Sequence, residues 1–349
     1  MNNKRVELSV HTNMSTLDSV NTAVDYINEA MKDWQPAVAI TDIDSVQAFP
    51  EAYKCASRAG GIKLIYGCEM HSEAGYPFYV LVKNKKGLKE LYELVSKAYN
   101  NKIPTVSIDQ IKRENMILGT SIMSDPIQKI IGGDDDEFET IIKKFDYVLL
   151  NPTEYFSWYT KGKINDKAKA IEITKRIIAL CEKNNVLPIA SDEAYFTFSK
   201  DGECRKILLD DKGVENCDEQ PNLYFRTTDE MLAEFDYLGN EKAFEIVVTN
   251  SNLIADMTYD TFAPFDTDAE YPNEIERLTE MTYNAAYKKY GEPLPEVVRA
   301  RIEKELNIIG GNSKSVMRFI LANKIAANAK KRVMSLETEV LSAHRLLQI

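Results

Sequence analysis

Side chains able to bind metal ions or move protons stand directly after short apolar or alternating runs of the sequence. They are Ser9 and His11, Asp18, Asp42 and Asp44, Glu69 and His71, and Asp192 with Glu193. Carboxylates at the ends of several strands of one α/β barrel are the ligands that a hard-metal phosphoesterase uses. An acidic residue at the start of a loop also caps helices, so Asp18, Asp44 and Asp192 each have a purely structural interpretation. Only the whole set points to chemistry.

Histidine and cysteine are too scarce for several kinds of site. The 349 residues include only His11, His71 and His344, so a centre built from many imidazoles is excluded. Five cysteines occur, and no two of them form a Cys-x-x-Cys pair. The sequence therefore predicts neither a zinc ribbon nor a disulfide framework, and reduced thiols are expected.

Charge is distributed unevenly along the chain. The whole sequence carries a net charge of -11, whereas residues 288–332 hold eleven basic and four acidic residues. A mainly acidic protein is repelled by nucleic acid, but this C-terminal stretch could still touch phosphates. The candidate phosphate contacts are Lys314, Arg318 and Lys324. The simpler interpretation of the same stretch is a solvated helical face.

Strands and helices alternate through the first two thirds of the sequence. Apolar and polar residues alternate over residues 6–11, which predicts a strand with Ser9 and His11 on one face. Further strands are predicted at residues 37–41, 63–69, 76–82, 117–121, 147–150 and 187–190, with helices at 20–31, 46–59, 85–99 and 166–184. This order predicts β-α-β units around a parallel sheet, either open or closed into a barrel, and in such folds functional groups gather at the C-terminal ends of strands.

The remaining third of the sequence predicts helices alone, at residues 228–235, 241–254, 274–290, 295–309 and 315–332. We therefore expect a barrel domain over residues 1–225 and a helical region over 226–349. No signal peptide and no apolar run of about 20 residues occurs, so a cytoplasmic protein without a membrane span is expected.

Three N-terminal segments are similar to a known family. RVELSVHTNMSTLDSV at 5–20, AVAITDIDSVQAFPEAY at 37–53 and GGIKLIYGCE at 60–69 resemble the polymerase and histidinol phosphatase (PHP) domain of bacterial DNA polymerase III α subunits. Residues 80–96, 223–248 and 290–306 also look like the C-type subunit of Gram-positive bacteria. The similarity covers roughly residues 5–325, and it implies a distorted (β/α)7-type barrel followed by the start of the polymerase palm.

The resemblance also implies a cluster of two or three metal ions held by nine residues at strand ends. Four of those positions keep a ligand, namely His11, Asp18, Glu69 and Asp192. Five positions have lost it and are now Ser9, Ile43, Pro77, Ile122 and Ala194. Changing one residue that supports a metal ligand already lowers metal affinity or activity about 10 to 100-fold, so these losses should abolish a multinuclear cluster.

A relocated ligand is the main alternative to that loss. His71 lies two residues after Glu69, on the same face if the strand continues. A single divalent ion, Zn²⁺, Mn²⁺ or Mg²⁺, could then be held by His11, Glu69, Asp192 and His71. The protein would in that case be a metal-dependent phosphoesterase or 3′–5′ exonuclease with a reduced site.

Two catalytic parts of the C-type polymerase have no counterpart in the sequence. The family's proofreading exonuclease is inserted after the strand that carries Glu69, whereas seven residues lead from Glu69 to Pro77 here. The chain also ends where the palm would begin its nucleotide-binding segment, so we expect no polymerase activity and assign no catalytic residue. The resulting hypothesis is a pseudoenzyme, without a resident cofactor, that binds replicative polymerase or its accessory proteins and makes at most weak contact with DNA.

Overall fold

The computed structural model describes residues 3–15, 17–101, 103–265 and 273–331, and the chain forms two compact units. The first unit runs to Phe265 and the second starts at Asp266, later than the predicted boundary at residue 225. The boundary lies later because the helices after residue 225 bury side chains against the sheet. Ile254 and Ala255, for example, pack in one cluster with Ile65 and Ile189 of the strands.

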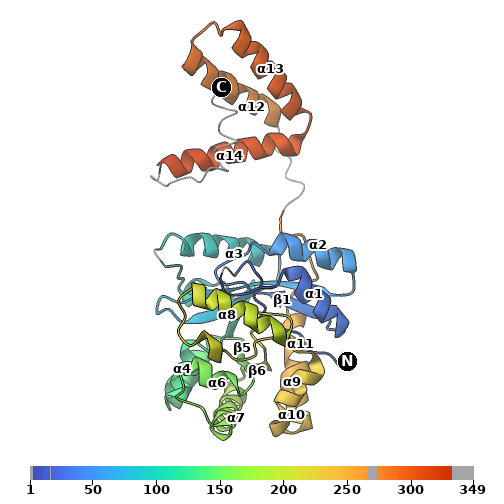
Figure 1. Cartoon of the computed structure of the whole chain (residues 1–349), viewed down its shortest axis with the longest axis vertical. Helices are drawn as coiled ribbons and strands as arrows, with labels where there is room; N and C mark the ends of the chain where they lie inside the picture. The colour runs from blue at the N-terminus through green and yellow to red at the C-terminus, as the bar shows by residue number, and fades with distance from the viewer. Residues whose placement is uncertain (1–2, 16, 102, 266–272, 332–349) are drawn as a thin grey trace. The chain divides into compact units, whose positions relative to one another are not determined.

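The first unit contains a six-stranded sheet whose strands follow one another in chain order (Figure 1). The strands are β1 (Ala37–Ile40), β2 (Lys63–His71), β3 (Pro77–Val82), β4 (Met116–Thr120), β5 (Tyr147–Leu150) and β6 (Leu187–Ala190). β1 contributes Ala37 and Ala39 to one buried cluster and Val38 and Ile40 to another. This alternation follows from the two-residue period of a strand, and it buries both faces of the sheet.

The sheet is mixed, not wholly parallel as predicted. β1 and β2 are parallel, as are β4, β5 and β6, but β3 is antiparallel to both of its neighbours. The reason is the length of the connection, because only residues 72–76 separate β2 from β3. A link this short can join only antiparallel strands, since parallel strands need a crossover of a dozen residues or more.

The N-terminal segment connects the two edges of the sheet. Glu7 forms a parallel bridge with Val38 of β1, and Val10 forms one with Ala194, just after β6. The first predicted strand is therefore present as two isolated bridges. Because one short segment pairs beside both edge strands, the sheet must curl. The structure thus confirms a curled α/β sheet, whereas a complete (β/α)7 barrel stays a prediction.

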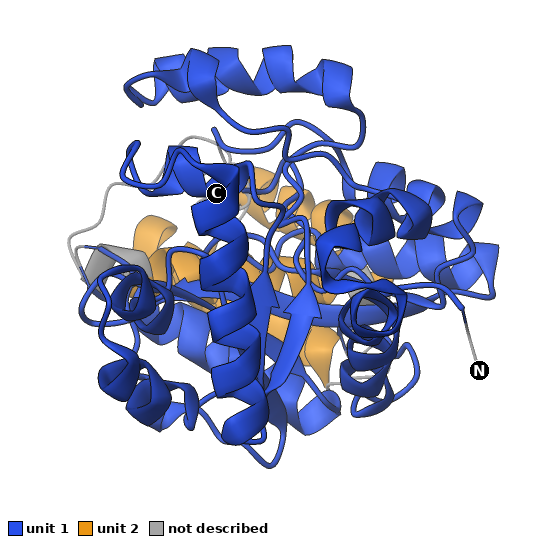
Figure 2. Ribbon diagram, turned by 90° about the horizontal axis from the view of Figure 1, so that it is seen from below, with its two compact units in different colours: residues 1–265 blue, residues 266–349 orange. Residues whose placement is uncertain are grey.

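Helices surround the curled sheet (Figure 2). They are α1 (Ala23–Lys32), α2 (Phe49–Ala59), α3 (Lys85–Ala98), α4 (Asp125–Ile131), α5 (Asp135–Ile142), α6 (Tyr155–Tyr159), α7 (Lys167–Lys183), α8 (Gly202–Asp211), α9 (Thr228–Glu234), α10 (Asn240–Phe244) and α11 (Asn250–Asp256). α8 is absent from the sequence prediction, because its apolar residues Ile207, Leu208 and Leu209 are consecutive and show no helical period. Across the described ranges, no helix has the length and apolar character needed to cross a membrane.

In its described part, residues 273–331, the second unit contains α12 (Glu274–Tyr290), α13 (Glu296–Gly310) and α14 (Ser313–Lys331), close to the predicted ranges. Leu278 of α12 packs with Val316 and Ile320 of α14 to form its small buried cluster. Arg318 and Lys324 are exposed on α14, whereas the side chain of Lys314 lies outside the described residues.

Candidate functional site

The predicted site residues fall into separate groups of contacts. Asp192 belongs to a buried group with Arg5, Glu7, Ser191 and Arg226, called the Asp192 cluster below. His11 and Glu69 contact each other, with Tyr79 and Glu193 beside them, and form the His11 cluster. Asp18 contacts Arg205 and Lys212 of the α8 region. His71 contacts Asp44.

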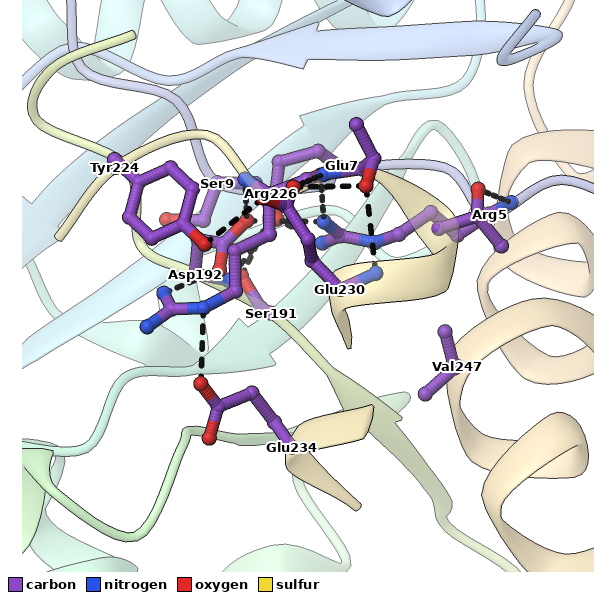
Figure 3. Close-up of polar contacts among 12 residues, drawn as sticks. Arg5, Glu7, Ser9, Ser191, Asp192, Tyr224, Arg226, Glu230, Glu234 and Val247 are labelled. Carbon is purple, nitrogen blue, oxygen red and sulfur yellow. Dashed lines mark hydrogen bonds and ion pairs between the residues drawn. The ribbon is translucent and has the colours of Figure 1, made fainter. Parts of the chain in front are cut away.

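The Asp192 cluster is an ion-pair network in which no carboxylate is left free (Figure 3). Asp192 accepts hydrogen bonds from Arg5 Nη1 at 2.9 Å and from Arg226 Nη1 at 3.0 Å, and also from the backbone N of Arg226 at 2.8 Å. Glu7 pairs with Arg5 and accepts from Ser191 Oγ at 2.5 Å. Burial raises the pKa of Glu7 despite the opposing charge of Arg5. Two guanidinium groups therefore contact both carboxylate oxygens of Asp192, the atoms through which it would bind a metal ion.

The His11 cluster joins an imidazole to two carboxyl groups through one phenol. His11 Nε2 lies 2.9 Å from Glu69 Oε2, and the hydroxyl of Tyr79 lies 2.9 Å from the same oxygen. That hydroxyl also lies 3.0 Å from Glu193 Oε1. Because a phenol has a single hydrogen to donate, a proton on Glu193 would supply the second of these two hydrogen bonds.

The pKa values in the His11 cluster move in different directions. Burial alone would lower the pKa of His11, but the hydrogen bond and charge of Glu69 outweigh it and raise that pKa. Burial likewise opposes ionisation of Glu69, yet His11 lowers the pKa of that carboxyl. Burial raises the pKa of Glu193 to about 7, and its backbone has the unusual φ of 46°. His11 and Glu69 therefore each favour the charged form of the other, beside a carboxylic acid whose pKa is about 7.

Asp18 is held by two basic side chains. Its Oδ1 accepts a hydrogen bond from Arg205 Nη2 at 2.7 Å, and its Oδ2 pairs with Lys212 Nζ. Burial works against ionisation, but Arg205 and Lys212 lower the pKa of Asp18. The Arg205 guanidinium also lies 3.9 Å from the ring centroid of Tyr195, which stacks on His11 at 4.2 Å.

Four of the positions predicted to have lost a family ligand have no side-chain donor in the structure. Ile43 is bridged to Glu69, and Ala194 is buried beside Val10, so both stand near retained residues. Ile122 is buried among apolar side chains. Pro77 is the first residue of β3 and pairs directly with His71 of β2.

The arrangement does not fit a multinuclear metal centre. Among the residues that the structure describes, no group of three or more His, Cys, Asp or Glu side chains could hold a metal ion. His11 and Glu69 come together, whereas Asp18, Asp192 and His71 each have partners of their own.

Several residues of the site were missed by the sequence reasoning. Arg5 and Glu7 share the alternating pattern of Ser9 and His11, so the face of that strand could have revealed them. Arg205 and Arg226 carry no comparable local signal, because their partners Asp18 and Asp192 are distant in sequence.

Comparison with known proteins identifies relatives of this chain. Residues 7–186 match the sequence model of the PHP domain. The protein "DNA polymerase III PolC-type" of Clostridium perfringens is 34% identical over 263 residues, which are 72% of this chain and 18% of that protein. The Bacillus subtilis protein of the same name has the same identity and coverage. The chain thus spans less than a fifth of the length of these relatives.

One solved structure covers most of the chain at low similarity. A lesion-specific endonuclease from Pyrococcus furiosus is 12% identical and covers 90% of both chains, with a TM-score of 0.36. The likeness between the two chains is therefore distant.

Proposed function

The chain belongs to the PHP domain family, and from this premise we propose that it is a catalytically impaired member related to the DNA polymerase III α subunit. In this proposal it acts in the cytoplasm by binding proteins of DNA replication. Its C-terminal helices correspond to the beginning of the polymerase palm. Neither a polymerase active site nor a resident metal cluster contributes to its activity.

One observation carries the proposal: two of the three retained carboxylates are neutralised by arginine and lysine side chains of the chain itself. Asp192 is paired with Arg5 and Arg226, and Asp18 with Arg205 and Lys212. Each metal ion would have to displace buried or half-buried cations from its ligand. With these internal pairs, the negative charges of Asp18 and Asp192 are compensated without a metal ion. This suits a binding protein, whereas a metal-dependent phosphoesterase would keep such carboxylates available to its metal.

The catalytic half of the proposal is tested on the purified full chain. Elemental analysis by mass spectrometry should find no multinuclear metal content, and hydrolysis of phosphomonoesters and DNA 3′ ends should equal that in buffer. Added Mn²⁺, Zn²⁺ or Mg²⁺ should not change this result. Two bound equivalents, with activity lost in both His11→Ala and Glu69→Ala, would overturn the proposal.

The proposed binding to replication proteins needs a separate measurement. The endogenous protein, recovered by immunoprecipitation, should enrich the replicative polymerase or its accessory proteins over an unrelated acidic bait of similar size. If folded bait repeatedly recovers no replication protein, the binding role is wrong even when the protein is inactive.

A reduced, mononuclear phosphoesterase site is the second candidate, and the position of His71 favours it. His71 pairs across the sheet with Pro77, the residue at a lost histidine position, and directly opposed residues share a face. Its Nδ1 lies 3.2 Å from Asp44 Oδ2, and this imidazole is partly exposed. One metal equivalent that disappears in His71→Ala would support this candidate over the pseudoenzyme.

A further inference from the structure

We propose that Arg205 and Lys212 form an internal counter-charge at Asp18 that replaces a divalent cation and fastens the α8 region over the His11 cluster. The inference deepens the proposed function and rests on its claim that the multinuclear metal cluster is absent. It adds that the contacts of Arg205 and Lys212 with Asp18 let the first unit fold without a metal ion. The same contacts prevent metal ions from binding to Asp18.

The two side chains match the charge of a divalent ion and use both carboxylate oxygens. Arg205 Nη2 donates to Asp18 Oδ1 at 2.7 Å, and Lys212 Nζ pairs with Oδ2. Arg205 Nε also donates to the backbone carbonyl of Asp18 at 2.7 Å. Two positive charges therefore meet Asp18 through three contacts, and each carboxylate oxygen already faces a cation that a metal ion would have to displace.

Arg205 is built into the fold and is not a surface side chain that happens to reach Asp18. Only 5% of Arg205 and 7% of Asp18 are exposed to solvent. The remaining guanidinium nitrogen, Nη1, donates to Gln220 Oε1 at 2.9 Å, and Gln220 Nε2 donates to the carbonyl of Gly202 at 2.7 Å. Gln220 thus ties the guanidinium to the first residue of α8. A buried ion pair with its other donors satisfied is much harder to open than an exposed one.

Tyr195 lies between Arg205 and His11 and contacts both side chains. The Arg205 guanidinium lies 3.9 Å from the Tyr195 ring centroid, at cation–π distance. The Tyr195 and His11 rings stack with centroids 4.2 Å apart and planes 14° apart. Arg205 therefore links α8 to Asp18 and, through Tyr195, to His11.

The test uses the full chain with Arg205→Gln and Lys212→Gln combined, which removes both charges and keeps polar side chains. Its midpoint of thermal unfolding should be lower than that of the wild type by about 5 °C or more, because Asp18 becomes a buried, unpaired charge. Millimolar Mn²⁺ should restore part of the loss in this variant and leave the wild type unchanged. KCl at equal ionic strength should not substitute for Mn²⁺.

Matched variants separate this effect from general damage to α8. Lys206→Gln on the same helix removes a lysine paired with the exposed Glu203, and it should behave as the wild type. Adding Asp18→Asn to the double variant should abolish the Mn²⁺ response. If the double variant does not fold, Lys212→Gln alone, whose lysine side chain is 44% exposed, is titrated with Mn²⁺ by calorimetry. Tighter binding than in the wild type is then expected.

The outcomes distinguish the two proposals. A double variant with unchanged stability, or with no response to Mn²⁺, overturns the internal counter-charge and leaves the proposed function standing. A wild-type protein that already binds two metal equivalents overturns the proposed function itself. An Mn²⁺ response that survives Asp18→Asn would place the ion elsewhere and overturn the assignment to Asp18.

Discussion

At the scale of single residues, Asp192 is fully buried and pairs with two arginines, so its charge and theirs depend on each other for compensation. Removing its charge in Asp192→Asn leaves Arg5 and Arg226 short of a buried counter-charge. We expect the free energy of unfolding to fall by about 3–5 kcal/mol, as measured by urea denaturation. Glu234→Gln is the matched control, since Glu234 also pairs with Arg226 but is one-third exposed. It should cost less than about 1 kcal/mol, and equal losses in the two variants would contradict this account.

Glu193 predicts a dependence of stability on pH. Burial raises its pKa from 4.5 to about 7 in the folded protein, so the folded state holds more protons than the unfolded state between these values. The stabilising contribution is complete below pH 4.5 and is lost as the pH rises through 7, amounting to about 3 kcal/mol. Glu193→Gln should remove this decline when urea unfolding is measured across that interval.

His11 contributes to the same measurement. Its raised pKa gives a decline of the same sign in the wild type. The charge of Glu193 is one cause of that shift, so part of the His11 decline is also lost in Glu193→Gln. The difference between the two curves therefore reports Glu193 together with its coupling to His11. Parallel curves would show that folding does not raise the pKa of the Glu193 carboxyl.

At the scale of elements, β4 and β5 meet at a position that only glycine can occupy. Gly119 pairs with Tyr147, and a Cβ atom at Gly119 would lie 2.0 Å from Tyr147 Cζ. Gly119→Ala must displace a buried ring, so we expect a loss of about 1–3 kcal/mol in the free energy of unfolding. In a Tyr147→Leu background the same substitution should cost clearly less, because the ring is gone. Additive losses in this double-mutant cycle would refute the steric explanation.

α8 shows why an element outside the sheet matters to the site. It provides Arg205 and precedes Lys212, the two cations that meet Asp18, although Asp18 belongs to the N-terminal loop. An early loop therefore supplies the acid, and a later helix region supplies its two counter-charges.

At the scale of the whole molecule, charge separates the C-terminal helix from the rest of the chain. α14 contains five basic residues and no acidic one, in a chain of net charge -11. We expect weak binding to DNA that decreases steeply with salt, as measured by fluorescence anisotropy. Arg318→Ala with Lys324→Ala should reduce the salt slope by about 2, one for each phosphate that is no longer neutralised.

Two arginines of α13 provide the control for the DNA measurement. Arg299 and Arg301 already pair with Glu303 and Glu305 on the same helix. Arg299→Ala with Arg301→Ala should therefore leave the slope nearly unchanged. An equal reduction in both double variants would indicate a general charge effect and no specific contact by α14.

Much of the fold was predictable because it depends on local patterns. The period of two over residues 6–11 and the apolar run at 37–41 indicate strands from their own residues alone. The family was likewise readable from the three N-terminal segments, and the comparisons confirm it. The direction of β3 and the end of the first unit were not read correctly, because they depend on a short connection and on the packing of α9 to α11.

The sequence by itself determined that four of the predicted ligand positions have no side-chain donor, because the side chains of isoleucine, proline and alanine have no donor atoms in any fold. It also determined that four other predicted positions, His11, Asp18, Glu69 and Asp192, carry side chains that can bind a metal ion. Only the tertiary structure decided what these four residues contact. Arg205 meets Asp18 across 187 residues of sequence, and Arg5 meets Asp192 across the same separation. Such pairs arise when packing brings distant segments together, and no local period or spacing encodes them.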